Sequence, residues 1–108
     1  MTKNKYIYNY KDITMTAYAS NIRWARFNVR QLYYYINSGM YMFGDRIKND
    51  NTKVYYLDFK EFGYDIEMEI KATSFPKAMR KVVKLYNQII DEDKEPDEIM
   101  GLEVIKYE

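Results

Sequence analysis

The stretch Tyr18–Ile36, YASNIRWARFNVRQLYYYI, decides the fold that the sequence predicts. Apolar residues recur in it at spacings of three and four, the repeat of a helix with one buried face. These residues are Tyr18, Ile22, Ala25, Val29, Leu32 and Ile36. Asn37-Ser38-Gly39 follows, and because Gly readily adopts the left-handed conformation that closes a helix, we expect the helix to end there. Its start stays open, since Asp12, Thr14, Thr16 or Ser20 could each cap it.

The outer side of this predicted helix carries basic and aromatic residues. We predict that it binds a partner through Arg23, Trp24, Arg26, Phe27, Arg30, Tyr34 and Tyr35. Trp, Tyr and Arg are enriched at protein interfaces, whereas Arg beside aromatic rings also suits contacts with phosphates and bases. Three explanations stay open: a protein partner, nucleic acid, or a second covered face whose arginines pair with nearby acidic residues. A homodimer through Trp24 and Phe27 is compatible with either kind of binding.

Composition limits the classes of protein that remain. The 108 residues, of which 47% are hydrophobic and 18% aromatic, predict one globular domain over residues 1–108. A net charge of +1 gives no global attraction to nucleic acid or an anionic membrane. The chain has no Cys and no His, so it lacks thiolate chemistry and the commonest general base and metal ligand. We therefore expect no enzyme, no metal site and no cofactor.

The remaining composition suggests where the protein acts. The amino terminus lacks the apolar run of a signal peptide, and no run of about 18 apolar residues occurs, which predicts a cytoplasmic protein without a membrane partner. The 13 tyrosines, together with the many residues encoded by AT-rich codons, are typical of small phage or mobile-element proteins that act by binding.

Five further stretches have the composition of strands. They are residues 5–10, 40–48, 52–60, 64–71 and 101–108. In 64–71, Ile66, Met68 and Ile70 alternate with charged residues, as in a strand with one buried face. We expect 5–10 to be an edge or first strand and 52–60, apolar on both sides, to be a central one. The short connections from 40 to 71 predict an antiparallel arrangement.

A second helix is predicted after Thr73 or Ser74, either of which can cap it, with Pro76 in its first turn. Its apolar face comprises Phe75, Met79, Val82, Tyr86 and Ile89, widened by Ala78, Val83 and Ile90. Its outer side forms a basic ridge, which could bind nucleic acid, of Lys77, Arg80, Lys81 and Lys84. The acidic residues from Asp91 to Glu98 lack the spacing and the Gly of a calcium loop, so we expect a solvated loop there.

These elements predict an α+β fold, a small single domain in the order β-α-β-β-β-α-β. Its antiparallel sheet would carry two helices packed on one face. The order of helix, three strands and helix over residues 18–91, with Ser74-x-x-Lys77-Ala78-x-x-Lys81 at the second helix, resembles the double-stranded-RNA-binding domain. That resemblance implies RNA binding through the basic start of this helix.

Two functions follow as expectations. The first is a non-enzymatic binding protein, in its most concrete form a small phage or mobile-element inhibitor. It would dock on a host defence protein or nucleoprotein complex, as anti-CRISPR proteins do. The alternative is a protein that binds nucleic acid directly, either like a double-stranded-RNA-binding domain or as a DNA-binding accessory protein.

Overall fold

The computed structural model describes residues 3–37, 53–59 and 65–106, and within them all side chains but those of residues 33, 35–37, 53 and 58. The strands are β1 (Asn4–Tyr10), β2 (Ile13–Ala19), β3 (Lys53–Asp58), β4 (Ile66–Ala72) and β5 (Gly101–Lys106). The helices are α1 (Ile22–Asn37), α2 (Phe75–Asp91) and α3 (Pro96–Ile99). The strand predicted at 40–48 lies outside the described residues.

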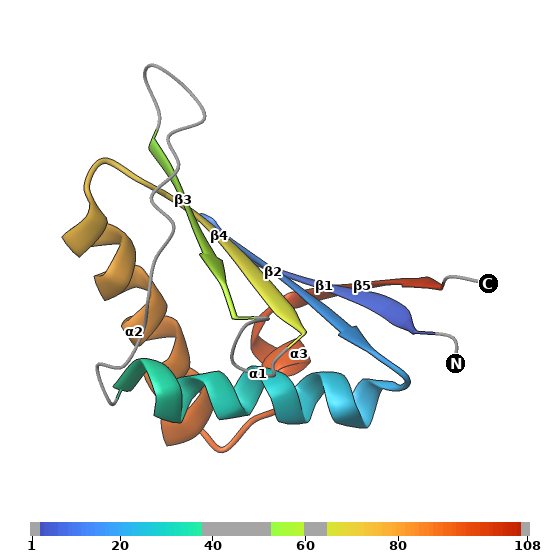
Figure 1. Cartoon of the computed structure of the whole chain (residues 1–108). Helices are drawn as coiled ribbons and strands as arrows, with labels where there is room; N and C mark the ends of the chain where they lie inside the picture. The colour runs from blue at the N-terminus through green and yellow to red at the C-terminus, as the bar shows by residue number, and fades with distance from the viewer. Residues whose placement is uncertain (1–2, 38–52, 60–64, 107–108) are drawn as a thin grey trace.

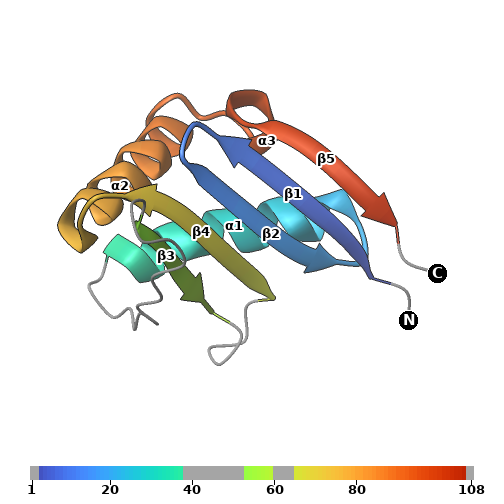
Figure 2. The same ribbon diagram turned by 90° about the horizontal axis from the view of Figure 1, so that it is seen from above.

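The described strands form one antiparallel sheet in the order β3-β4-β2-β1-β5. The two long helices, α1 and α2, lie against the same face of this sheet, and α3 sits beside β1 and β5 (Figures 1 and 2). The prediction of an α+β fold with an antiparallel sheet and two helices on one face is confirmed.

Strand β2 occupies the place where the sequence predicted the beginning of the long helix. Residues 13–19 alternate between buried and partly exposed side chains, which is the period of a strand. Tyr18 matches the helical repeat of the stretch after it, but its backbone pairs with Lys5 of β1. Helix α1 begins instead at Ile22, where the side chain of Asn21 accepts a hydrogen bond of 3.1 Å from the backbone N–H of Trp24. The order of elements therefore begins β-β-α.

The core lies between the sheet and the two long helices. One row of opposed residues crosses the whole sheet on that side: Leu102, Tyr8, Met15, Met68 and Leu57. All but Leu102 are almost completely buried. Helix α1 adds Ala25, Val29 and Leu32 to the same core, as its apolar repeat predicted.

The position of β3 in the sheet differs from its prediction, and only one of the two alternatives predicted for β1 holds. Strand β1 is the first strand of the chain but not an edge strand, because the end of the chain returns to pair with it and places it between β2 and β5. Strand β3, which was expected to be central, is the outermost described strand on its side of the sheet. Val54 and Tyr55, which lie on opposite faces of β3, are nevertheless both buried. Position in a sheet depends on pairings between distant segments, which local sequence patterns do not encode.

Helix α2 agrees closely with its prediction. Ser74 caps it by accepting a hydrogen bond of 3.4 Å from the backbone N–H of Lys77, and Pro76 lies in the first turn. Val83, which was expected to widen the apolar face, is 38% exposed. At the other end, Asp93 adopts a left-handed backbone with φ of 49°. The backbone N–H groups of Asp93 and Lys94 donate to the carbonyls of Ile90 and Ile89, the pattern of a Schellman motif.

Candidate functional site

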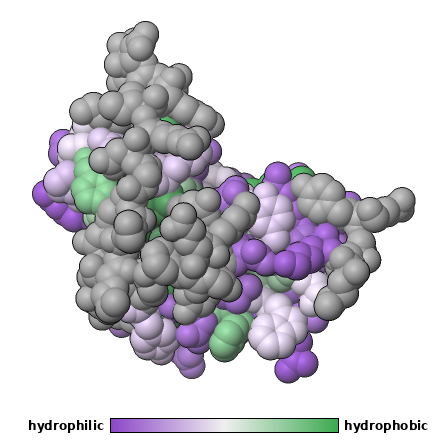
Figure 3. All heavy atoms as spheres, in the orientation of Figure 1, coloured by the Kyte–Doolittle hydropathy of each residue, from purple (hydrophilic) through white to green (hydrophobic). Residues whose placement is uncertain are grey.

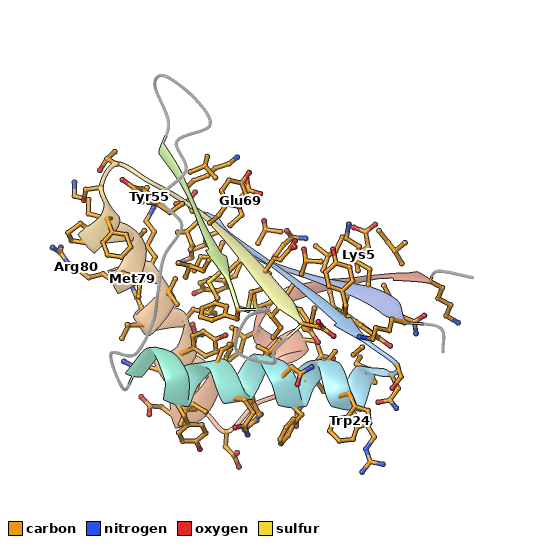
Figure 4. All side chains as sticks on the ribbon, in the orientation of Figure 1. Lys5, Trp24, Tyr55, Glu69, Met79 and Arg80 are labelled. Atoms are coloured by element: carbon orange, nitrogen blue, oxygen red, sulfur yellow. The ribbon has the colours of Figure 1, made fainter. Side chains whose placement is uncertain are left out.

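Helix α1 presents aromatic side chains to solvent along the side that faces away from the sheet. Trp24 is 56% exposed, Phe27 49% and Tyr34 62%, whereas Ala25 and Val29 are fully buried on the inner side. The three exposed rings follow one another at spacings of three and seven residues, so they lie within an arc of roughly 80° on the outer side of the helix, and we call them the aromatic stripe. Figure 4 shows the labelled Trp24 pointing away from the sheet, on the opposite side from Lys5 and Glu69.

Two rings of the aromatic stripe pack on each other. The centroids of Trp24 and Phe27 are 5.7 Å apart, and their planes lie at 85°, which is an edge-to-face contact. Asn21 caps the helix at the backbone of Trp24, so the turn that carries Trp24 is formed before any partner binds. Asn21, Arg23, Trp24 and Phe27 line a hollow on this surface. Rigid, exposed aromatic rings beside a cation are typical of protein interfaces.

Two of the three predicted arginines are already engaged within the chain. Arg26 donates two hydrogen bonds to the carboxylate of Asp97, of 2.9 Å from Nε and 2.7 Å from Nη2. Arg30 donates a hydrogen bond of 2.7 Å from Nη2 to the carbonyl of Lys94, and its Nε lies 3.7 Å from Oε2 of Glu95. Arg26 and Arg30 thus pair with acidic residues, as the third explanation expected. The second covered face that this explanation also required is not seen among the described residues, because Trp24, Phe27 and Tyr34 are exposed.

The acidic segment, residues 91–98, is accordingly more than a solvated loop. It contains the last residue of α2 and most of α3, and the side chain of Asp97 is only 16% exposed. The hydrogen bonds from Arg26 hold the pKa of the Asp97 carboxyl below its ordinary value of 3.8, and the same bonds raise the pKa of Arg26. Both groups therefore remain charged at neutral pH, and the charge of Arg26 is locally neutralised.

Arg23 is in a different situation from the other two arginines. It is exposed, and its side chain makes no hydrogen bond or ion pair within the described part of the chain. It lines the hollow next to Trp24 and also a second hollow formed with Arg26, Arg30 and Glu95, and Phe27 borders both. The side chain of the predicted site residue Tyr35 lies outside the described set. The described site therefore consists of Arg23 and the aromatic stripe.

The basic ridge on α2 is also partly engaged. Lys81 donates hydrogen bonds of 2.8 Å to the carboxylate of Asp12 and to the carbonyl of Lys71. The pKa of Asp12 is lowered by this hydrogen bond and by the charge of Lys81. By contrast, the side chains of Lys77, Arg80 and Lys84 are exposed and pair with none of the residues in the described ranges. Arg80 projects outward from the helix (Figure 4).

Sequence reasoning missed the acidic residues that bind the arginines. One local signal for their helix was present: Pro96 after Glu95, with Glu98 three residues further on, is the pattern of a capped helix start. In the structure, the backbone N–H of Glu95 donates to the side chain of Glu98 at 3.3 Å, which completes this capping box. The pairing with α1 had no local signal, because it joins residues far apart in the sequence.

Among the described residues, no group of three or more acidic side chains lies close enough to hold a metal ion. No described helix combines the length and apolar character needed to cross a membrane. No family model matches the chain, nor does any curated protein or solved structure to which it was compared.

Proposed function

We propose that this chain is a non-enzymatic binding protein that docks on a protein partner through Arg23 and the aromatic stripe of α1. The observation that carries the proposal is that Trp24 and Phe27 pack edge to face although each is about half exposed. An indole and a phenyl ring left in water cost free energy that burial in a partner recovers. Aromatic residues that are already ordered lose little further entropy on binding.

The specific form of the proposal is a small phage or mobile-element inhibitor. Its target would be a host defence protein or nucleoprotein complex of the CRISPR type, encountered in the cytoplasm. Support for this form comes from the length of 108 residues, the 13 tyrosines, and the absence of His and Cys for catalysis. The exposed aromatic stripe supports docking in general, whereas the identity of the target rests on these sequence features.

Direct binding of nucleic acid is the alternative, and the ion pairs weigh against it. Arg26, Arg30 and Lys81 already donate to protein oxygens. Asp97 and Glu95 also place negative charge beside Arg26 and Arg30, and this charge repels phosphate groups. A nucleic acid would therefore have to bind mainly through Arg23, Lys77, Arg80 and Lys84, the cations of the two candidate surfaces that pair with none of the described residues.

A titration separates the two functions. The purified protein is titrated with mixed single-stranded and duplex RNA and DNA at about 50 and 200 mM salt, a range over which phosphate-driven affinity falls steeply. We expect no saturable binding at either concentration. Saturable binding that collapses at the higher salt, and that is lost in Arg80→Glu, would overturn the protein-docking proposal.

Docking itself is tested with purified CRISPR effector complexes, assembled with guide RNA and immobilised. We expect the wild type to bind one of them and both Trp24→Ala and Phe27→Ala to weaken binding by roughly tenfold or more, as for interface hot spots. Val83→Ala is the matched control, because Val83 is an exposed apolar residue on α2. Equal binding by all four proteins would show that the aromatic stripe is not the docking surface.

A further inference from the structure

The three arginines of α1 follow one another along one flank of the helix, at spacings of three and four residues. Arg26 holds the carboxylate of Asp97 through two hydrogen bonds, and Arg30 lies 3.7 Å from the carboxylate of Glu95. Arg23, one turn before Arg26, has no carboxylate from the described residues. Carboxylates are therefore the groups that this flank binds within the chain, and the described residues supply none to Arg23.

The place of Arg23 in the helix is unfavourable for folding. Helix α1 has no acidic residue in its first turn, and Arg23 lies in that turn. The amino-terminal end of a helix carries partial positive charge, so a cation there is destabilising. Positions that work against the local structure are expected to be functional or strained sites, and Arg23 has no compensating partner among the described residues. A carboxylate supplied from outside would relieve this repulsion and pair with the guanidinium.

An apolar surface adjoins the same arginine. Arg23 and Phe27 are four residues apart and together border the two hollows described above, of which one is also lined by Trp24. In the space-filling view, hydrophobic and near-neutral residues alternate with hydrophilic ones along the lower edge of the molecule, where α1 lies (Figure 3). A ligand at Arg23 therefore contacts a cation and an aromatic pair at once.

We propose that the partner presents an acidic segment in which an Asp or Glu side chain stands beside a large apolar side chain. The carboxylate binds Arg23, as Asp97 binds Arg26, and the apolar side chain packs on Trp24 and Phe27. This inference rests on the proposed docking function and specifies its partner. A nucleic-acid backbone fits less well, because phosphates running along the arginine row would meet Glu95 and Asp97, whereas one carboxylate reaches Arg23 at the end of the row.

A random dodecapeptide library displayed on phage and selected on the immobilised full chain tests the inference. We expect enriched peptides to carry Asp or Glu next to Trp, Phe, Leu or Met. A labelled synthetic copy of the best peptide should bind roughly tenfold more weakly when its acidic residue becomes the amide, and equally weakly to Arg23→Glu. Because Trp24 is the only tryptophan of the chain, a change in its fluorescence locates a tryptophan-free peptide on this surface.

Matched variants distinguish the possible failures. Arg23→Glu removes a cation from the first turn, so it should fold at least as well as the wild type, and urea unfolding of this variant separates lost binding from unfolding. Val83→Ala should leave binding unchanged. Enriched peptides that need Trp24 but contain no acidic residue, or that bind Arg23→Glu normally, would overturn this inference and leave docking intact.

The other outcomes are also decisive. A selection that enriches no peptide overturns the acidic-segment inference, while the test with effector complexes still decides docking. Peptides that bind Trp24→Ala normally would count against both proposals. Concentration-dependent dimerisation that disappears in Arg23→Glu would show that a second copy of the chain occupies the surface, and would overturn the inference.

Discussion

Arg26 and Asp97 join helix α1 to helix α3 through a bidentate ion pair, although they are 71 positions apart in the sequence. The guanidinium Nε and Nη2 lie 2.9 and 2.7 Å from the two carboxylate oxygens. This geometry fixes both side chains more firmly than a single contact would. It fastens the acidic segment to the helix that carries the candidate docking surface, and so it sets the edge of that surface.

We expect this ion pair to make stability depend on pH in the acidic range. The pKa of Asp97 is lower in the folded chain than its ordinary value of 3.8, so the unfolded chain takes up the proton first. The contribution to folding is complete above pH 4 or so and is lost as the pH falls through the lower pKa of the folded state. Urea unfolding measured at neutral pH and in steps below pH 4 should show this loss.

Asp97→Asn should reduce that dependence and lower the free energy of unfolding at neutral pH by about 1 kcal/mol, a value kept small because water partly screens the pair. The control is Asp65→Asn, which breaks the exposed ion pair of Asp65 with Lys3. That change should have little effect on stability. If both variants lost the same free energy of unfolding, burial and bidentate geometry would add no stability to the Arg26–Asp97 pair.

Tyr8→Phe should stabilise the protein. The ring of Tyr8 is fully buried, and its hydroxyl has no hydrogen-bond partner in the described part of the chain. Burial raises the pKa of this hydroxyl, and the negative charge of Asp97 raises it further by a smaller amount. Removing an unsatisfied buried hydroxyl while keeping the ring should raise the free energy of unfolding by about 1 kcal/mol.

Urea unfolding measures this change, and Tyr86→Phe serves as the comparison. Tyr86 is also buried, but its hydroxyl donates to the sulfur of Met15 at 3.5 Å. Its removal should therefore not stabilise the fold. A loss of stability in Tyr8→Phe would reveal a hydrogen bond to the Tyr8 hydroxyl, for instance from an ordered water.

Asp93→Gly should also stabilise the protein, by about 0.5–1 kcal/mol. Asp93 has a φ of 49° in the Schellman motif that ends α2, a conformation that glycine adopts without steric strain. Thermal or urea unfolding provides the measurement. Asp93→Val is the opposite control, because a β-branched side chain is strained at positive φ and should destabilise the same position. A stabilising valine would contradict this explanation.

The free energy of unfolding should depend only weakly on the residues of the candidate surface. Trp24→Ala removes a half-exposed side chain and its edge-to-face contact with Phe27, and should lower the free energy of unfolding by no more than about 1 kcal/mol. Arg23→Glu should increase it by roughly 0.5 kcal/mol, through the favourable interaction of an acidic residue with the first turn of a helix. Urea unfolding of both variants checks these values. A large loss of stability in either one would indicate a structural role instead.

Much of the fold could be predicted wherever one local pattern was unambiguous. The sequence of α2 contains a capping serine at Ser74, a proline in the first turn and an apolar repeat of helical period. The sequence of β4 alternates strictly between apolar and charged residues, and both elements were therefore placed correctly. Strand β2 was not recognised, because Tyr18 extended the helical repeat of α1 backward into a segment that also alternates. Two periodicities overlapped there, and only pairing with β1 and β4 favours the strand.

In the candidate site, too, local patterns predicted some features and contacts between distant segments decided the others. The sequence singled out Trp24 and Phe27 as outward-facing aromatic residues, which the helical repeat alone suffices to predict. It could not reveal which arginines were available to a partner. That depended on the acidic segment folding back to α1, over a separation of 71 residues in the case of Asp97 and Arg26.

The sequence by itself thus determined the class of fold, most of its helices and strands, and the apolar and outer faces of α1, because periodicity and capping act between residues a few positions apart. Only the tertiary structure decided the strand order, the insertion of β2, and the pairing that occupies Arg26 and Arg30 but leaves Arg23 exposed. These features arise from contacts between distant segments. Such contacts form through backbone pairing and charge interactions in the folded chain, and no local pattern records them.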